Sequence, residues 1–395
     1  MNPHLILYCQ HSLGMGHLVR SLALADALTQ YFDVTFLNGG RWPQGFRRPG
    51  HVSVIDLAPI GMAEDGSLTS LTPNMTLEAS QADRLFVIKQ LLDLRPPQAL
   101  LIELYPFGRK KFRFEIDPLI DAARQGGAII TCSVRDILVA SRHDQQRHDN
   151  RAAATLNEKF DCVIIHSDEK FARLEESFKP TAPLSIPIEY SGFVAPRSNE
   201  APRQRTNRLV VSTGGGIVGG PLYRTALAAY PDIRTATDLP MEIITGPFLP
   251  DDEWTDLCKK AADMDGVTLI RSTPNLYARM CAATHSISQC GYNSALDILR
   301  SGVSGIVVPF VREGEDEQLA RASRLAKLGA LTLIHPDKLS ADALAMAVKT
   351  LAANKTSHAK PHGLRINGAV ETAAIVNRYL NARARKQTLH VGGAG

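Results

Sequence analysis

Short apolar runs alternate with longer segments of helical periodicity along almost the whole chain. This alternation is typical of right-handed βαβ units on parallel sheets. Several of the runs are apolar nearly throughout, which indicates strands that helices cover on both faces. Helical spacing of apolar residues over 18–30 and 77–92 predicts such helices. The first half is therefore predicted to be one doubly wound α/β domain, with strands at residues 5–9, 34–37, 52–57, 99–103, 128–132, 162–166 and 185–191.

A change of composition divides the chain. Residues 195–207 are rich in proline and arginine and lack periodic apolar positions, which predicts a linker. A second alternation of strands and helices follows. We therefore predict two doubly wound, Rossmann-like domains facing a cleft, with ligands beyond the carboxyl ends of the strands. The expected segments are domains at 1–194 and 208–365, a C-terminal helix at 366–388 with the option of packing back on the first domain, and a disordered tail at 389–395.

Composition narrows the classes of protein that fit this pattern. With 395 residues, 44% of them hydrophobic and 21% charged, the chain is too long for a small binding module and too apolar for a largely disordered protein. A net charge of +4 without long runs of like charge argues against nucleic acid as a partner. Scattered cysteines and the lack of a signal-peptide pattern predict a cytoplasmic protein. Membrane contact is expected to be peripheral at most, at the inner face of the membrane.

The first candidate for chemistry is Gly14-Met15-Gly16-His17, between the first predicted strand and helix. Glycines allow a tight turn there, and a helix N-terminus lowers the pKa of a nearby imidazole. His17 is therefore placed to act as a neutral base. The alternative is a helix-start residue without a chemical role, and the motif alone does not decide between them.

A second glycine-rich turn, with five glycines in residues 214–220, also joins a predicted strand to a helix. Backbone amides in such a turn can cradle a phosphate. The spacing fits G-x-G-x-x-G, but the following strand ends without a ribose-binding acid, so NAD is disfavoured. The alternative is a strand-to-helix turn with spare glycines.

A third segment runs from Gly291 into a helix expected to begin near Ser294. Asn293 and Ser294 are expected to cap this helix, which leaves other amides free for a phosphate. Asp297 could then accept hydrogen bonds from two ribose hydroxyls. Ser294 and Asp297 fit a capping box equally well, and in that case the acid serves only the helix.

Acidic residues precede a later helix that Glu317 and Gln318 open. Acids in a first helical turn usually stabilise the helix dipole, and these two residues matter only if a polyol ligand lies opposite. Asp263 and Asp265 make a D-x-D spacing, which in this context is more typical of a loop than of a magnesium site.

Together these motifs resemble family 28 of the GT-B glycosyltransferases, most strongly over residues 208–352, where the glycine turn, the Ser-x-x-Gly-x-x-x-x-x-Asp helix and the Pro-Phe…Glu-Gln segment occur in the family's order. The resemblance implies a GT-B architecture with an acceptor-side N-terminal domain and a nucleotide-sugar-binding C-terminal domain. It implies transfer from a nucleoside-diphosphate sugar, expected to be UDP-linked, to a glycan, lipid-linked or small-molecule hydroxyl. An inverting reaction without metal or cofactor, in cell-envelope or polysaccharide synthesis, is expected.

The resemblance also implies roles for individual residues. His17 would be the catalytic base beside the glycines Gly14 and Gly16. Within the donor site, the glycines of the turn would face the diphosphate, and the turn at 270–273 would face the nucleobase. Asp297 would bind the ribose, and the Glu-Gln pair would bind the sugar. The donor-binding residues are expected to be Gly214, Gly215, Gly216, Ser272, Thr273, Gly291, Asn293, Ser294, Asp297, Glu317 and Gln318.

Two other functions stay open at this point. The string from Gly14 to Leu22 also resembles the UDP-sugar hydrolases of pseudaminic acid synthesis, in which the histidine would activate water. A sugar-nucleotide-binding partner subunit without activity of its own is the other alternative. Asp297 and Glu317 stand where the family commonly has Glu and Gln, which leaves the donor sugar open.

Overall fold

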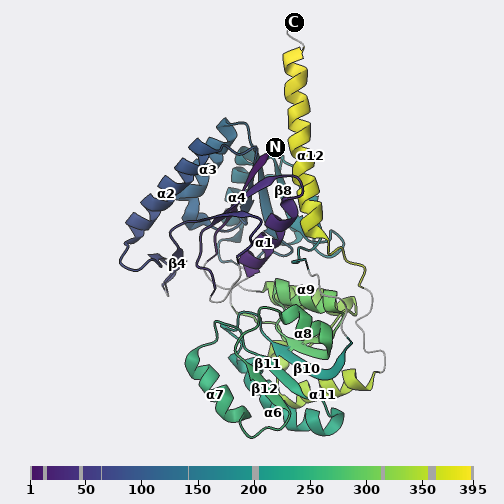
Figure 1. Cartoon of the computed structure of the whole chain (residues 1–395). Coiled ribbons are helices and arrows are strands. Elements are labelled where there is room, and N and C mark those ends of the chain that lie inside the picture. The colour runs from purple at the N-terminus through teal and green to yellow at the C-terminus, as the bar shows by residue number, and fades with distance from the viewer. Residues whose placement is uncertain are drawn as a thin grey trace. The chain divides into compact units, whose positions relative to one another are not determined.

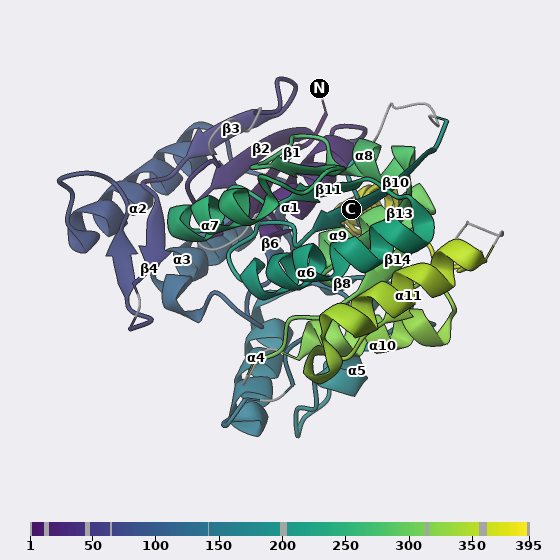
Figure 2. The same ribbon diagram turned by 90° about the horizontal axis from the view of Figure 1, so that it is seen from below.

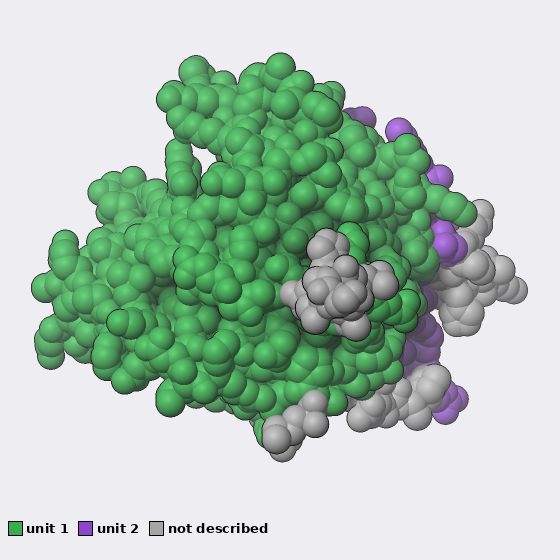
Figure 3. Space-filling view, turned by 90° about the horizontal axis from the view of Figure 1, so that it is seen from above, with its two compact units in different colours: residues 1–138, 143–197, 364–395 green, residues 139–142, 198–363 purple. Residues whose placement is uncertain are grey.

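The computed structural model describes residues 2–11, 16–43, 48–63, 65–140, 142–197, 204–312, 316–354 and 362–392, the last six of these by their backbone alone. It forms two compact units, coloured separately in Figure 3. The N-terminal unit comprises Met1–Leu138, His143–Arg197 and Leu364–Gly395, and the C-terminal unit comprises Val139–Arg142 and Ser198–Gly363.

Within the described residues, the N-terminal unit has a seven-stranded parallel sheet in the order β3-β2-β1-β6-β7-β8-β9. The chain starts at the centre and winds outward in both directions, so the carboxyl ends of all these strands meet at one edge. A hairpin of β4 (Ile60–Met62) and β5 (Leu68–Ser70), which the sequence pattern did not predict, follows the edge strand. The sheet strands are β1 (His4–Cys9), β2 (Asp33–Asn38), β3 (Ser53–Asp56), β6 (Ala99–Glu103), β7 (Ile129–Arg135), β8 (Cys162–His166) and β9 (Ile188–Tyr190).

Helices cover both faces of this sheet (Figure 1). One core lies under α1 (Gly16–Leu28) and α12 (Gly368–Gly392), and the other lies under α2 (Leu77–Leu94), α3 (Arg113–Gln125) and α4 (Gln145–Lys159). Because side chains alternate between the faces of a strand, a strand with helices on both sides needs apolar residues at successive positions, as in β1 and β6. The short helices η1 (Lys110–Phe112) and α5 (Leu174–Ser177) complete the unit.

The C-terminal unit repeats this plan. Its described strands form a parallel sheet in the order β12-β11-β10-β13-β14-β15. Helices α6, α7 and α11 share one core, with α6 and α11 side by side in Figure 2. The elements are β10 (Thr206–Ser212), α6 (Gly220–Thr237), β11 (Met241–Ile244), α7 (Asp251–Ala261), β12 (Val267–Ile270), α8 (Leu276–Ala282), β13 (Ala283–Ser288), α9 (Tyr292–Ser301), β14 (Ser304–Val307), α10 (Glu317–Lys327), β15 (Thr332–Leu333), η2 (Pro336–Lys338) and α11 (Ala341–Ala353).

The chain then returns to the N-terminal unit. The Asp168 carboxylate accepts a hydrogen bond from the Arg365 amide at 3.1 Å, and the Phe193 amide donates to the Arg365 carbonyl at 2.8 Å. From there α12 packs on α1. The helix runs to Gly392, so residues 389–392 of the expected disordered tail are helical, and residues 393–395 lie outside the described part. Every helix in the described ranges falls short of the length or the apolar character needed to cross a membrane.

Candidate active site

His17 lies at the carboxyl edge of the N-terminal sheet, as the second residue of α1. Its Nδ1 is 2.6 Å from Oε1 of Glu103, the last residue of β6. A carboxylate only accepts hydrogen bonds, so we assign the imidazole proton to Nδ1 and the basic lone pair to Nε2. Arg20 Nη2 lies 3.2 Å from the same Nδ1, but its shorter contact is the one to Glu103 Oε1. The side chain of His17 is 21% exposed and that of Glu103 is 1% exposed. The pair is therefore a partly accessible base oriented by a buried carboxylate.

Two arginines share the same carboxylate. Arg20 donates from Nη2 to Glu103 Oε1 at 2.5 Å, and Arg109 donates from Nη2 to Oε2 at 3.2 Å. These cations and His17 hold the pKa of Glu103 well below its usual range. Burial lowers the pKa of His17 to about 4, with the two arginines acting in the same direction and Glu103 against them. His17 is therefore neutral at pH 7, as the sequence predicted, but burial is the main cause.

Sequence reasoning missed Glu103. The available signal was a charged residue at the end of an otherwise apolar strand, since parallel sheets place functional groups at that position. His17 and Glu103 are 86 residues apart in the chain, and they meet because β6 is the neighbour of β1 in the sheet. Of the two turn glycines, Gly16 is the first residue of α1, and Gly14 lies outside the described residues.

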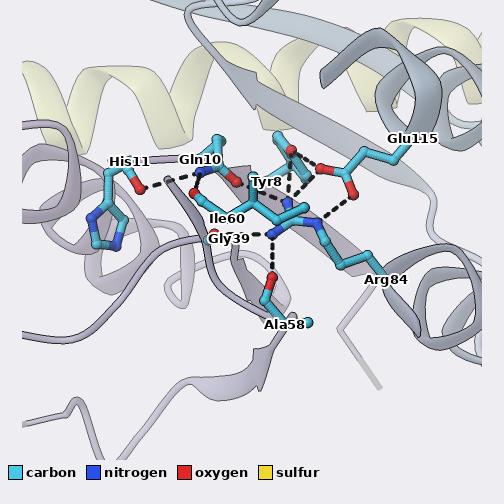
Figure 4. Close-up of polar contacts among 8 residues, drawn as sticks. All are labelled: Tyr8, Gln10, His11, Gly39, Ala58, Ile60, Arg84 and Glu115. Atoms are coloured by element: carbon cyan, nitrogen blue, oxygen red, sulfur yellow. Dashed lines mark hydrogen bonds and ion pairs between the residues drawn. The ribbon is translucent and has the colours of Figure 1, made fainter. Parts of the chain in front are cut away.

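A buried polar cluster braces the loops near this edge (Figure 4). The Arg84 guanidinium is fully buried and pairs with the Glu115 carboxylate, with Nε to Oε2 at 2.7 Å. It also donates to Gln10 Oε1 at 2.8 Å and to the carbonyl oxygens of Gly39 and Ala58 at 3.0 and 2.9 Å. One side chain from α2 thus links the segments that follow β1, β2 and β3.

In the C-terminal unit, the glycine turn packs tightly against the segment that follows β11. Gly214 and Gly216 have φ angles of 72° and 92°, a conformation that favours glycine. A β-carbon on Gly216 would lie 2.0 Å from the Thr245 carbonyl oxygen, so no larger residue fits without movement. A β-carbon on Gly214 would lie 3.4 Å from the Ser294 hydroxyl. The structure therefore brings the second and third sequence motifs together.

The helix of the third motif begins earlier than expected. Gly291 is the N-cap of α9, and no side chain caps the helix. The capping-box interpretation of Ser294 and Asp297 is therefore wrong, because Asp297 lies more than one turn inside the helix. A β-carbon on Gly291 would meet no atom of the described residues within 4 Å, so these residues leave space at the start of α9. Free amides at a helix start are a favourable environment for an anion.

Asp297 has an unusual environment for a carboxyl group. Burial raises its pKa to about 7, and the Arg300 cation partly opposes this shift. No amide or side chain among the described residues donates a hydrogen bond to it. Such a carboxyl group retains its capacity to accept hydrogen bonds from a ligand.

The other residues expected in the donor site follow strands β12, β13 and β14. Gln318, at the start of α10, accepts hydrogen bonds from the amides of Cys290 and Phe310, at the carboxyl ends of β13 and β14. Glu317 precedes it as the first residue of that helix, and Asn293 is the second residue of α9. After β12, Ser272 is exposed, and the Thr273 hydroxyl accepts hydrogen bonds from the Asn275 amide and Arg279 Nε. All of these positions follow carboxyl ends of strands of one sheet.

In the part of the chain that the structure describes, no group of three or more His, Cys, Asp or Glu residues is arranged to hold a metal ion. Asp263 and Asp265 precede β12, at the amino edge of the sheet. The glycine turn lies at the opposite, carboxyl edge.

Comparisons with known proteins concern the domain family and the fold. Residues 210–373 match the glycosyltransferase family 28 C-terminal domain. The glycosyltransferase of kitacinnamycin is similar in structure, with 16% identity, a TM-score of 0.61, and coverage of 96% of this chain and 100% of that one. UGT2 of Phytolacca americana, solved with UDP-2-fluoro-glucose and pterostilbene, has 16% identity, a TM-score of 0.57 and coverage of 96% and 94%. MurG of Acinetobacter baumannii has 15% identity, a TM-score of 0.55 and coverage of 97% and 100%.

No curated protein sequence matches the chain. The structural matches confirm the predicted α/β fold with GT-B architecture. The domain match confirms the resemblance to family 28 over the C-terminal unit and, with it, the enzyme class glycosyltransferase.

Proposed function

We propose that the protein transfers a sugar from a nucleoside-diphosphate sugar, expected to be UDP-linked, to the hydroxyl of an acceptor. The observation that carries this proposal is the packing of the glycine turn against the start of α9, within the segment that matches the family 28 domain. The bound UDP-2-fluoro-glucose of the Phytolacca enzyme, which has a similar fold, supports a UDP-linked donor. A role in cell-envelope or polysaccharide synthesis belongs to the same proposal.

In the proposed donor site, backbone amides replace a metal ion. The turn at 214–216 and the first amides of α9 would bind the diphosphate, and the positive end of the helix dipole would stabilise the leaving group. Asp297 would accept the ribose hydroxyls, Glu317 would bind the sugar, and Ser272 with Thr273 would border the base. Asn293 and Ser294, in the first turn of α9, would line the diphosphate.

In the proposed reaction, His17 Nε2 removes the proton from the acceptor hydroxyl as the oxygen attacks the anomeric carbon. The bond from that carbon to the diphosphate breaks, and the UDP leaves with the electron pair. Glu103 holds the imidazole in the required tautomer and stabilises the imidazolium that forms. Attack opposite to the leaving group inverts the anomeric centre.

A UDP-sugar hydrolase remains the second candidate, because the same base could activate water. Donor hydrolysis in the absence of acceptor is expected at a low rate from a transferase as well. A binding partner without turnover is the third, and it would bind UDP without releasing sugar.

A panel of nucleotide sugars followed by a turnover assay tests the proposal. The true donor is expected to raise the melting temperature, since a ligand at about 100 times its Kd adds about 2.7 kcal/mol of stability. Incubation of that donor with lipid and glycan extracts should then release UDP faster and yield a glycosylated product. Rapid release of free sugar that extracts do not change would identify a hydrolase, and the absence of any stabilising nucleotide would refute the donor site.

A further inference from the structure

Two side chains on α10 hold the peptide from which α9 starts. Gln318 Oε1 accepts hydrogen bonds from the amides of Cys290 at 3.1 Å and Phe310 at 3.2 Å. Arg321, one turn along the same helix, donates from Nη1 to the Cys290 carbonyl oxygen at 2.8 Å. Both polar backbone groups of Cys290, the residue before the N-cap Gly291, are thus bound by α10.

The same segment is linked to the glycine turn on its other side. Gln289 donates from Nε2 to the Val218 carbonyl oxygen at 3.2 Å. Ser294 approaches Gly214, as described above. Residues 289–294 therefore connect α10 to the turn, and a displacement of Cys290 would move the first amides of α9 relative to it.

We propose that Gln318 and Arg321 are positioning residues, which place the first amides of α9 for the diphosphate of the donor. The inference rests on the proposed function, because it requires a diphosphate at these amides. It also gives Gln318 a role in binding protein rather than sugar hydroxyls, and two backbone amides already bind its carbonyl oxygen. Arg321 is only 1% exposed, so we expect it to act on a ligand indirectly, through the protein groups that it contacts.

UDP, which lacks the sugar to be transferred, separates the two roles of Gln318. In Gln318→Leu the hydrogen-bond acceptor is lost, and we expect binding of UDP and of the UDP-sugar to weaken equally, by about tenfold in calorimetric titration. Arg321→Met is expected to change both affinities in the same direction. Lys327→Met, at the exposed far end of α10, is the control and should bind like the wild type.

Amide hydrogen exchange gives a second measurement that needs no ligand. Exchange at Cys290 and Phe310 should accelerate in Gln318→Leu and stay unchanged in Lys327→Met. Gln318→Leu therefore tests the inference even if Arg321→Met fails to fold.

The outcomes distinguish this inference from the proposed function. If Gln318→Leu binds UDP like the wild type and loses affinity only for the UDP-sugar, Gln318 contacts the sugar and the inference is wrong. Unchanged exchange at both amides would overturn it as well. Wild-type protein that binds neither UDP nor any UDP-sugar would instead refute the proposed function and the inference with it.

Discussion

The arginines around Glu103 give the proposed base an unusual electrostatic setting. A carboxylate beside an imidazole raises the pKa of the imidazole. Here Arg20 and Arg109 compensate the charge of Glu103, and burial keeps His17 neutral. The charge state of the His17–Glu103 pair therefore depends on four side chains, because Arg20 and Arg109 contribute as well. With a pKa lowered to about 4, His17 is unprotonated at neutral pH.

The first prediction concerns His17 itself. His17→Ala should lower turnover by about 10²–10⁴-fold, because the general base is lost. UDP affinity should stay nearly unchanged, since the proposed donor groups lie in the other unit. Steady-state rates and calorimetry of the same preparations measure the two effects. Equal losses of turnover and UDP affinity would contradict the assignment of His17 as base.

The second prediction concerns Asp297. Asp297→Ala should weaken UDP-sugar binding by about 1.5–3 kcal/mol, the usual effect of losing a charged hydrogen-bond acceptor. Hydroxyl groups bind a carboxylate better than a carboxylic acid, and the pKa is raised to about 7. Wild-type affinity should therefore rise from about pH 6 to about pH 8, and Asp297→Asn should abolish this rise. A variant with a lower melting temperature but wild-type affinity would show a structural role alone.

At the scale of elements, the carboxyl edge of the C-terminal sheet is assembled from backbone rather than from large side chains. Gly216 and Gly246 both have positive φ, and the segments that they belong to approach at backbone contact distance. This close approach places the turn after β10 against the segment after β11. Within the turn, the Gly214 amide donates to the Ser212 hydroxyl at 3.2 Å, so the amides of Gly215 and Gly216 are the ones that we propose for an anion.

Gly216→Ala is expected to disturb this packing. The new methyl group would collide with the Thr245 carbonyl, and the φ of 92° is strained for alanine, so the unfolding free energy should fall by about 1–3 kcal/mol. UDP affinity should fall as the turn shifts. Gly50→Ala serves as a control in chemical denaturation, because its β-carbon would meet no atom within 4 Å in the part of the chain that the structure describes. A Gly216→Ala protein as stable as this control would disprove the close approach.

At the scale of the whole molecule, buried neutral histidines tie stability to pH. His166 is fully buried between the hydroxyls of Ser133 and Ser191, at 2.6 and 3.0 Å, and burial lowers its pKa to about 3. Since an unfolded histidine titrates near pH 6.5, the unfolded chain binds more protons than the folded one below that pH. Folding therefore becomes less favourable as the pH falls.

The expected result is a loss of unfolding free energy from about pH 6.5 downward, at up to about 1.4 kcal/mol per pH unit for each such histidine. His166→Gln should reduce this slope in urea denaturation. His143→Gln is the control, because the His143 side chain is fully exposed. Identical slopes in all three proteins would contradict the neutral buried state of His166.

Transfer without metal is part of the proposed function and concerns the whole molecule. Turnover should persist in EDTA, because the proposed diphosphate ligands are amides and helix dipoles. Complete loss of activity that magnesium restores would overturn this part of the mechanism.

Local pattern alone determined the elements and the class of fold. Runs such as β1 and β6 are apolar at successive positions because both faces are covered. The turn at 214–220 stands out because Gly214 and Gly216 have positive φ angles, which favour glycine. The same local information misplaced the start of α9, since Ser294 and Asn293 resemble caps while Gly291 holds that position. Short strands such as β4 and β5 were missed because three residues carry little periodicity.

Only the tertiary structure decided which distant residues meet. The pairing of His17 with Glu103, the two arginines on that carboxylate, and the binding of Cys290 by Gln318 all depend on strand order and on how helices pack. These contacts join residues far apart in the chain, and no local periodicity encodes which strands become neighbours. The sequence thus indicated candidates such as His17 but not Glu103, and the fold determined the partners that set the charge and position of His17.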